Sequence, residues 1–115
     1  MKIERFENLI VWQKASDFVA LIYQLFGTSR DYGFRDQILR AVLSIMNNIA
    51  EGFERKGDRK FKHFLFIAKG SCGEVRSMLH IALRLRFITK AQFDTASACA
   101  LEISRMLSGF IKTLD

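Results

Sequence analysis

Apolar residues recur along most of this chain at intervals of three and four positions, the period of one face of an α-helix. Short polar segments divide the pattern into four stretches, which predict helices near residues 8–26, 36–54, 58–86 and 89–113. The expected core positions of these helices are, in order, Trp12, Ala15, Val19, Ile22 and Phe26; Ile38, Val42, Ile45, Ile49 and Phe53; Phe61, Leu65, Ala68, Cys72, Val75, Leu79 and Ala82; and Phe93, Ala96, Ala100, Ile103, Leu107 and Phe110. Short loops between four amphipathic helices predict an all-α fold, an antiparallel up-down-up-down four-helix bundle forming one domain over residues 1–115.

Several residues mark where the helices are expected to begin and end. Asn8 and Asp58 are good N-caps, and Thr89 with Gln92 has the spacing of a capping box. Gly27 is expected to close the first helix, followed by a loop over residues 28–35. The chain has no proline, so nothing of that kind interrupts the long helices.

The apolar arcs of three helices cover nearly half of the circumference, more than a single core requires. Excess apolar surface often marks an interface, so we expect a homo-oligomer. The alternative is a thick core built around the 11 phenylalanines. In the third helix, the helical spacing of apolar residues continues through Gly70 and Gly73, so these glycines are expected to be helical. We expect another helix or a neighbouring subunit to approach closely there.

Charge is distributed unevenly along the chain. The net charge is +6, but residues 55–90 hold ten basic side chains against two acidic ones, and the remainder of the chain carries −2. Within that segment, Lys62, Lys69 and Arg76 recur every seven residues, and Arg59 and Arg84 extend their line over about 37 Å at helical rise. These five residues, the basic ridge, are candidates for binding RNA or DNA phosphates, with Phe66 beside them to stack on a base or bury in a neighbouring subunit. The alternative is a solvated face.

A second set of candidates consists of polar residues that border the apolar stripes. We expect these residues to form a structural hydrogen-bonded network or subunit-interface ion pairs that set the helix register. A catalytic pair made by two of its carboxylates, Glu51 and Glu74, is the alternative. The full polar set is Gln13, Arg40, Asn48, Glu51, Ser71 and Glu74.

The sequence contains no recognisable catalytic, metal or cofactor motif, so we expect a protein that is not an enzyme. His63 and His80 are too far apart on one helix to share a metal ion. Cys72 and Cys99 fall on apolar stripes, as expected of core residues in a reducing compartment. No apolar run is long enough for a signal-peptide core or a membrane span, which favours a cytoplasmic protein without membrane contact.

Specific motifs in the first three helices resemble one known family. They are Phe6-Glu7-Asn8-Leu9, Val11-Trp12-Gln13-Lys14-Ala15, Gln37-Ile38, Arg40-Ala41, Ser44-Ile45, Asn48-Ile49-Ala50-Glu51-Gly52-Phe53, Phe61, Phe64-Leu65, Ile67-Ala68, Gly70-Ser71 and Glu74. With these residues the chain resembles the four-helix-bundle protein family encoded in intervening sequences of bacterial 23S ribosomal RNA genes. The resemblance implies a four-helix bundle that assembles as a ring-like homopentamer.

The chain is also similar, more distantly, to the accessory variability determinant of diversity-generating retroelements. That similarity implies a basic pentamer that binds nucleic acid and a reverse transcriptase. Two functions follow from the residues and the resemblance together. One is an oligomeric accessory protein that binds structured RNA or DNA through phosphate contacts, and the other is an oligomeric scaffold for protein partners without a nucleic-acid role.

Overall fold

The computed structural model describes residues 2–114, which form one 3₁₀ turn at Phe6–Asn8 and four α-helices. The helices are α1 (Ile10–Phe26), α2 (Tyr32–Glu54), α3 (Asp58–Arg84) and α4 (Lys90–Lys112). They pack into an elongated body of 44 × 22 × 20 Å. The expectation of an all-α fold of four helices is therefore confirmed.

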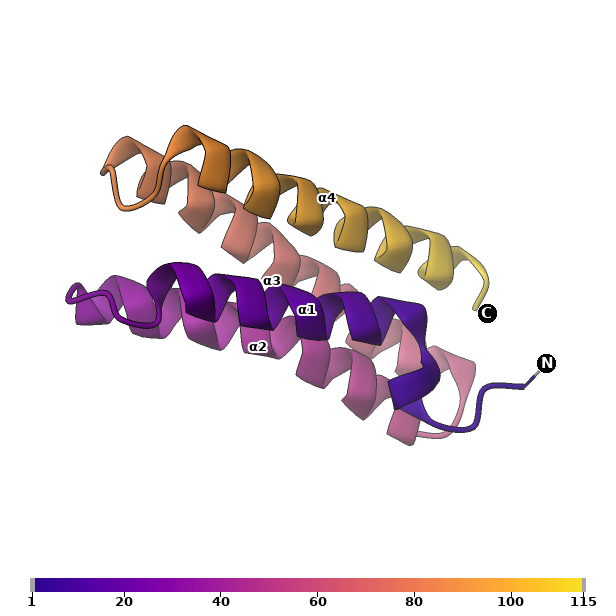
Figure 1. The fold of residues 1–115 in the computed structure, drawn as a ribbon. Coiled ribbons are helices and arrows are strands. Elements are labelled where there is room, and N and C mark those ends of the chain that lie inside the picture. The colour runs from indigo at the N-terminus through magenta and orange to yellow at the C-terminus, as the bar shows by residue number, and fades with distance from the viewer. Residues whose placement is uncertain (1, 115) are drawn as a thin grey trace.

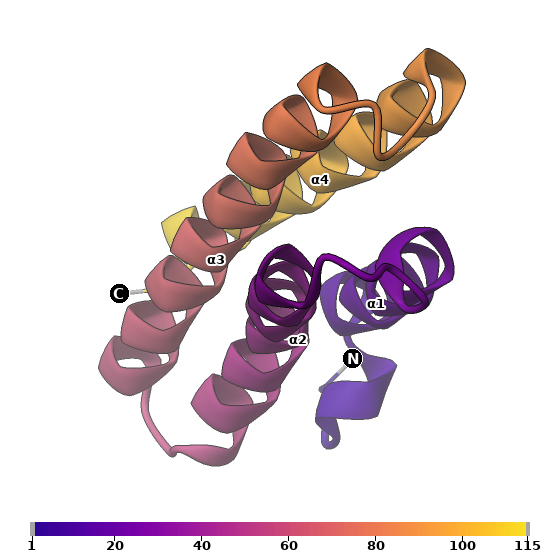
Figure 2. The same ribbon diagram turned by 90° about the vertical axis from the view of Figure 1, so that its left-hand side faces the viewer.

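The connecting turns alternate between the two ends of this body (Figure 1). The α1–α2 and α3–α4 turns lie at one end, and the α2–α3 turn lies at the other, together with both ends of the chain. Helix α3 packs against α2 on one side and against α4 on the other (Figure 2). Its remaining side carries exposed residues and faces outwards.

Small and branched apolar residues from all four helices fill the core. In α1, Val11 and Phe18 are more deeply buried than the predicted Trp12 and Val19, which are partly buried and pack against the core. Trp12 lies at the edge of the core, where its ring packs 5.3 Å from that of Phe6 in the 3₁₀ turn. The predicted stripes of the other helices are buried except for their terminal phenylalanines, Phe53, Phe61, Phe93 and Phe110, which are half-buried at the ends of the bundle.

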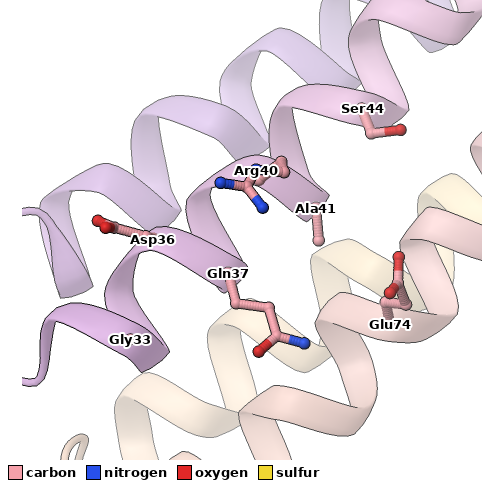
Figure 3. A pocket seen from close by; sticks show the side chains of 7 residues that line it. All are labelled: Gly33, Asp36, Gln37, Arg40, Ala41, Ser44 and Glu74. Carbon is pink, nitrogen blue, oxygen red and sulfur yellow. The ribbon is translucent and has the colours of Figure 1, made fainter.

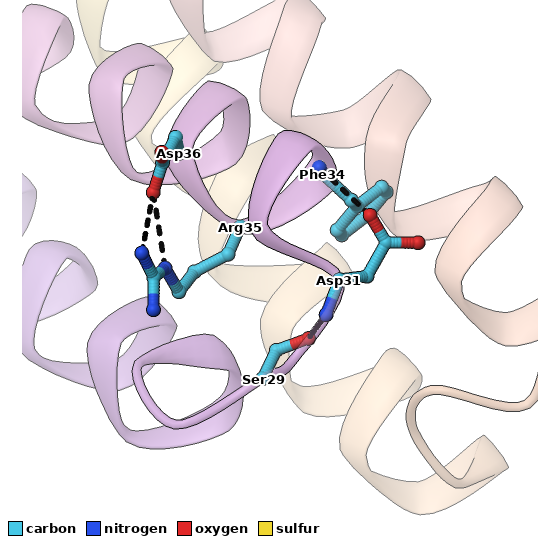
Figure 4. Close-up of polar contacts among 5 residues, drawn as sticks. All are labelled: Ser29, Asp31, Phe34, Arg35 and Asp36. Carbon is cyan, nitrogen blue, oxygen red and sulfur yellow. Dashed lines mark hydrogen bonds and ion pairs between the residues drawn. The ribbon is translucent and has the colours of Figure 1, made fainter.

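Helix α2 begins four residues before the predicted start, because Asp31 caps it (Figure 4). The Asp31 carboxylate accepts a hydrogen bond from the backbone N–H of Phe34 at 3.2 Å, and the Ser29 hydroxyl accepts one from the N–H of Asp31, also at 3.2 Å. These bonds satisfy donors that the first turn of a helix leaves free. The predicted loop therefore ends at Asp31, and Arg35 pairs with Asp36 inside the helix at 3.0 Å.

The ends of α3 also differ from the prediction. The N-cap is Gly57, whose φ of 107° suits glycine, and Asp58 is the first helical residue rather than the cap. The helix ends at Arg84 because Arg86 turns the chain with a φ of 65°, and the N–H of Phe87 donates to the carbonyl of Ala82 at 2.8 Å. The capping box of α4 is confirmed, with Thr89 and Gln92 each accepting a hydrogen bond from the other's backbone.

The close approach of two helices occurs at Gly52, not at the two glycines predicted for it. A Cβ atom at position 52 would lie 2.7 Å from the Cβ of Phe64 and 3.0 Å from the ring of Phe61. Within the described residues, no atom of another helix lies within 4 Å of a Cβ placed on Gly70 or Gly73, so no helix approaches them. Their role towards a neighbouring subunit stays a prediction.

Candidate nucleic-acid interface

The five residues of the basic ridge lie along the outer surface of α3. Arg59 and Arg84 are exposed near its two ends, and Lys62, Lys69 and Arg76 are partly exposed between them. Within residues 2–114, none of the five forms an ion pair. Unpaired cations repel one another and gain by contact with an anion, so this row is suited to a polyanion.

The ridge follows the border between α3 and α4. His80 is four residues beyond Arg76 on the same face, and its ring lies 5.0 Å from that of Phe93 in α4. The carboxylates of α4 are turned to other partners, because Glu102 pairs with Lys14 at 3.7 Å and Asp94 pairs with Lys90. The α4 carboxylates therefore leave the ridge un-neutralised.

Phe66 is the most exposed phenylalanine among the residues that the structure describes, with 53% of its surface accessible. On a helix, Lys62 and Lys69 are its neighbours at four residues before and three residues after. An exposed ring between two lysines can stack on a nucleic-acid base while the ammonium groups contact adjacent phosphates. The structure thus keeps Phe66 and the ridge together on one surface.

A second feature is a hollow of about 520 Å³ between α2 and α3 (Figure 3). Two residues of the polar set, Arg40 and Glu74, line it from opposite helices. A third lining residue, Ser44, connects the hollow to a hydrogen-bonded network beneath it. The complete lining is Gly33, Asp36, Gln37, Arg40, Ala41, Ser44 and Glu74.

The network joins α2 to α3 through Ser44, which belongs to one of the family motifs but not to the predicted polar set. Its hydroxyl lies 2.8 Å from that of Ser71, and the Asn48 amide donates to the Ser44 hydroxyl at 2.9 Å and to its carbonyl at 2.8 Å. We call Ser44, Asn48 and Ser71 the serine–asparagine network. The sequence signal that could have identified Ser44 as part of the network is its position, four residues from both Arg40 and Asn48 on the same face of the helix.

The other two members of the polar set lie elsewhere. Gln13 donates to the carbonyl of Glu7 at 2.8 Å, which ties α1 to the 3₁₀ turn. Glu51 accepts from Arg55 at 2.7 Å at the end of α2. The structure therefore places the six residues at three separate positions, and Glu51 is already paired with a cation.

Both cysteines have the character of core residues. Burial raises the pKa of Cys72 to about 11, and the nearby charge of Arg76 offsets only part of this effect. The Cys72 thiol donates to the carbonyl of Ala100 at 3.1 Å. Burial, followed by the charge of Glu102, also raises the pKa of Cys99. Neither thiol forms a reactive thiolate at neutral pH.

These observations define a compact all-α protein of four packed helices, with a row of cations on the outer side of α3 that form no ion pair within residues 2–114. Residues 7–109 match the model of the 23S rRNA-intervening sequence protein family, and the chain belongs to that family. No curated protein matches it. Among the helices of residues 2–114, none combines the length and the apolar character that a membrane crossing requires.

One solved structure similar to this chain is a protein of unknown function from the S23 ribosomal protein family of Bacteroides thetaiotaomicron VPI-5482. The two chains are 27% identical and superpose with a TM-score of 0.84. The similarity covers 89% of this chain and 98% of the other. The fold described above is thus shared by a crystal structure over nearly its whole length.

Proposed function

We propose that this chain is a non-enzymatic accessory protein that binds structured RNA or DNA through the basic ridge. The observation that carries the proposal is the row of five cations on α3 without an ion pair among the described residues. Contacts of this kind recognise the phosphate backbone and carry little sequence information. Phe66 adds a base-stacking surface between Lys62 and Lys69.

We further propose that the protein acts as a homo-oligomer of up-down-up-down bundles, with five subunits in a ring. Support comes from large apolar side chains, apart from Phe66, that α3 and its C-terminal end leave exposed: Ile67, Ile81 and Leu85 are 39–53% accessible. A ring would present five ridges to one nucleic acid, and their joint binding would be far tighter than that of one ridge. By distant similarity, a reverse transcriptase is a proposed protein partner.

The test is a fluorescence anisotropy titration of a structured RNA and a matched DNA duplex, repeated from low to physiological salt. Five phosphate contacts per subunit would lower the affinity for duplex DNA roughly 500-fold between 50 and 200 mM salt. Replacing Lys62 and Lys69 by glutamate should weaken binding strongly and flatten this salt dependence. The matched control carries Lys2→Glu and Lys112→Glu, two exposed lysines outside α3.

Absence of binding at the lowest salt would refute the nucleic-acid role.

The exposed apolar residues of α3 favour a second candidate, an oligomeric scaffold for protein partners. Both candidate functions require an oligomer, and light scattering distinguishes an oligomer from a monomer. A pentamer has five times the 13.3 kDa mass of the chain. Ile81→Asp with Leu85→Asp should reduce that mass if these residues lie in the subunit interface.

A further inference from the structure

A hollow of about 540 Å³ lies where the end of α2 meets the beginning of α3, beside the turn at residues 55–57. Its lining consists of Arg55, Arg59, Lys60, His63 and Phe64. Three of these side chains are permanent cations, and no acidic side chain of the described residues lines the hollow. Its volume falls within the range of about 300–1,000 Å³ that is typical of small-molecule sites.

The aromatic wall of this hollow is held in place by α2. Phe64 is half-buried, and its Cβ lies 2.7 Å from the point where a side chain at Gly52 would begin. The Arg55 guanidinium lies 5.3 Å from the centre of the Phe64 ring, and the edge-on ring of His63 lies 5.4 Å from it. Because α2 carries no side chain at position 52, the Cβ of Phe64 can lie against this helix, and the Phe64 ring is held between Arg55 and His63 as an aromatic surface of the hollow.

Two of the cations are available to an incoming anion. Arg55 is occupied by Glu51 at 2.7 Å, whereas Arg59 and Lys60 form no ion pair within residues 2–114. The N-cap Gly57 provides no side-chain hydrogen bond to the first turn of α3, whose positive potential is offset in part by Asp58. The hollow therefore combines an aromatic surface with unneutralised positive charge.

We infer that this hollow binds a nucleoside 5′-phosphate, either as a free nucleotide or as the phosphorylated 5′ end of a strand. A terminal phosphate carries a charge of about −1.5 to −2 at neutral pH, more than an internal phosphodiester, so two free cations favour it. The base of a terminal or free nucleotide is unstacked on at least one side and can reach an aromatic surface. The inference goes beyond the proposed backbone binding by the ridge, with which the hollow shares only Arg59.

The experiment compares single-stranded RNAs of about ten nucleotides that carry either a 5′-phosphate or a 5′-hydroxyl and a label at the 3′ end. The wild-type protein should bind the phosphorylated strand about tenfold more tightly, because charge-assisted hydrogen bonds of this kind are among the strong ones. Lys60→Ala should abolish the preference. Lys56→Ala is the matched control, because Lys56 is an exposed lysine of the neighbouring turn that does not line the hollow.

A competition arm with adenosine 5′-monophosphate identifies the source of the ligand. Displacement of the phosphorylated strand by the mononucleotide, and not by adenosine, supports a free-nucleotide site, and a preference without displacement supports recognition of strand ends. Equal binding of the two strands by the wild-type protein, without competition, would overturn the inference. Binding by the basic ridge is measured separately, as the affinity of wild type and Lys69→Glu for duplex DNA. A negative result for the hollow can therefore be distinguished from a negative result for the ridge.

Discussion

The two sides of α3 use polar side chains in opposite ways. On the side that faces α2, Ser71 is buried, and its hydroxyl bonds to Ser44, which also accepts from Asn48. On the side that borders α4, Lys69 and Arg76 are partly exposed and form no ion pair within residues 2–114. Neutral groups that satisfy one another stabilise the fold, whereas unpaired charges stabilise little until a ligand arrives.

The difference follows from the cost of burial. A hydroxyl can enter the α2–α3 contact because one hydrogen bond replaces its contact with water. Burying a lysine or arginine would require a buried counter-charge. The carboxylates of α4, the helix that borders the ridge, are already paired with Lys14 and Lys90 and do not provide one. The cations therefore remain at the rim. Substitutions on the two sides of α3 should accordingly affect different measurements.

The largest effect is expected at the closest point of the α2–α3 side. Gly52→Ala should lower the free energy of unfolding by about 2–3 kcal/mol, since its Cβ would collide with the Cβ of Phe64 and crowd the ring of Phe61. Urea denaturation measures this change. The control is Gly70→Ala, which meets no atom within 4 Å and should gain up to about 1 kcal/mol from helix propensity. Equal stability of the two variants would contradict the close approach.

A smaller loss of stability is expected when the serine–asparagine network is broken. Ser71→Ala removes the hydroxyl that bonds to Ser44 without adding volume to this buried position, which should cost about 1–2 kcal/mol. Adding Ser44→Ala should recover part of that loss, because it removes the hydroxyl that lost its bond to Ser71, while Asn48 still donates to the carbonyl of residue 44. Nucleic-acid affinity should stay within twofold of wild type. A change in affinity as large as that of a ridge variant would show that the two sides are not separate.

On the ridge, a single substitution should change binding and leave stability alone. Lys69→Gln should weaken duplex binding several-fold at low salt and reduce the salt slope by about one, the contribution of one phosphate contact. The free energy of unfolding should stay within about 0.5 kcal/mol of wild type. If the slope does not change, Lys69 does not contact phosphate.

The smallest effect concerns the thiol beneath the ridge. Burial raises the pKa of Cys72 to about 11, so at pH 8 this residue remains a thiol in the folded protein. Iodoacetamide should therefore modify Cys99, which is less buried, before Cys72. Mass spectrometry of the alkylated peptides measures the order, and urea should make the two rates similar. Faster alkylation of Cys72 in the folded protein would show that this part of the core opens.

Much of the local structure could be predicted from single residues and their spacing. The capping box at Thr89 and Gln92 and the buried stripe of α3 follow from local chemistry and from a period that continues through Gly70 and Gly73. The predicted start of α2 was late because Asp31 lies within the loop predicted over residues 28–35, and aspartate is favoured both in turns and as a helix cap. In the candidate site, the seven-residue spacing placed Lys62, Lys69 and Arg76 on one side of α3, which the structure retains.

What the sequence determined by itself was the number of helices, the apolar stripe of each and the place of the excess charge. These properties depend on residues within a few turns of one another. Only the tertiary structure decided which faces meet. It brought Gly52 against Phe64, joined Ser44 to Ser71 and assembled Arg55, Arg59 and Lys60 into one hollow. The rotation of each helix about its axis is set by packing against its neighbours, and the pattern along a single helix does not contain that information.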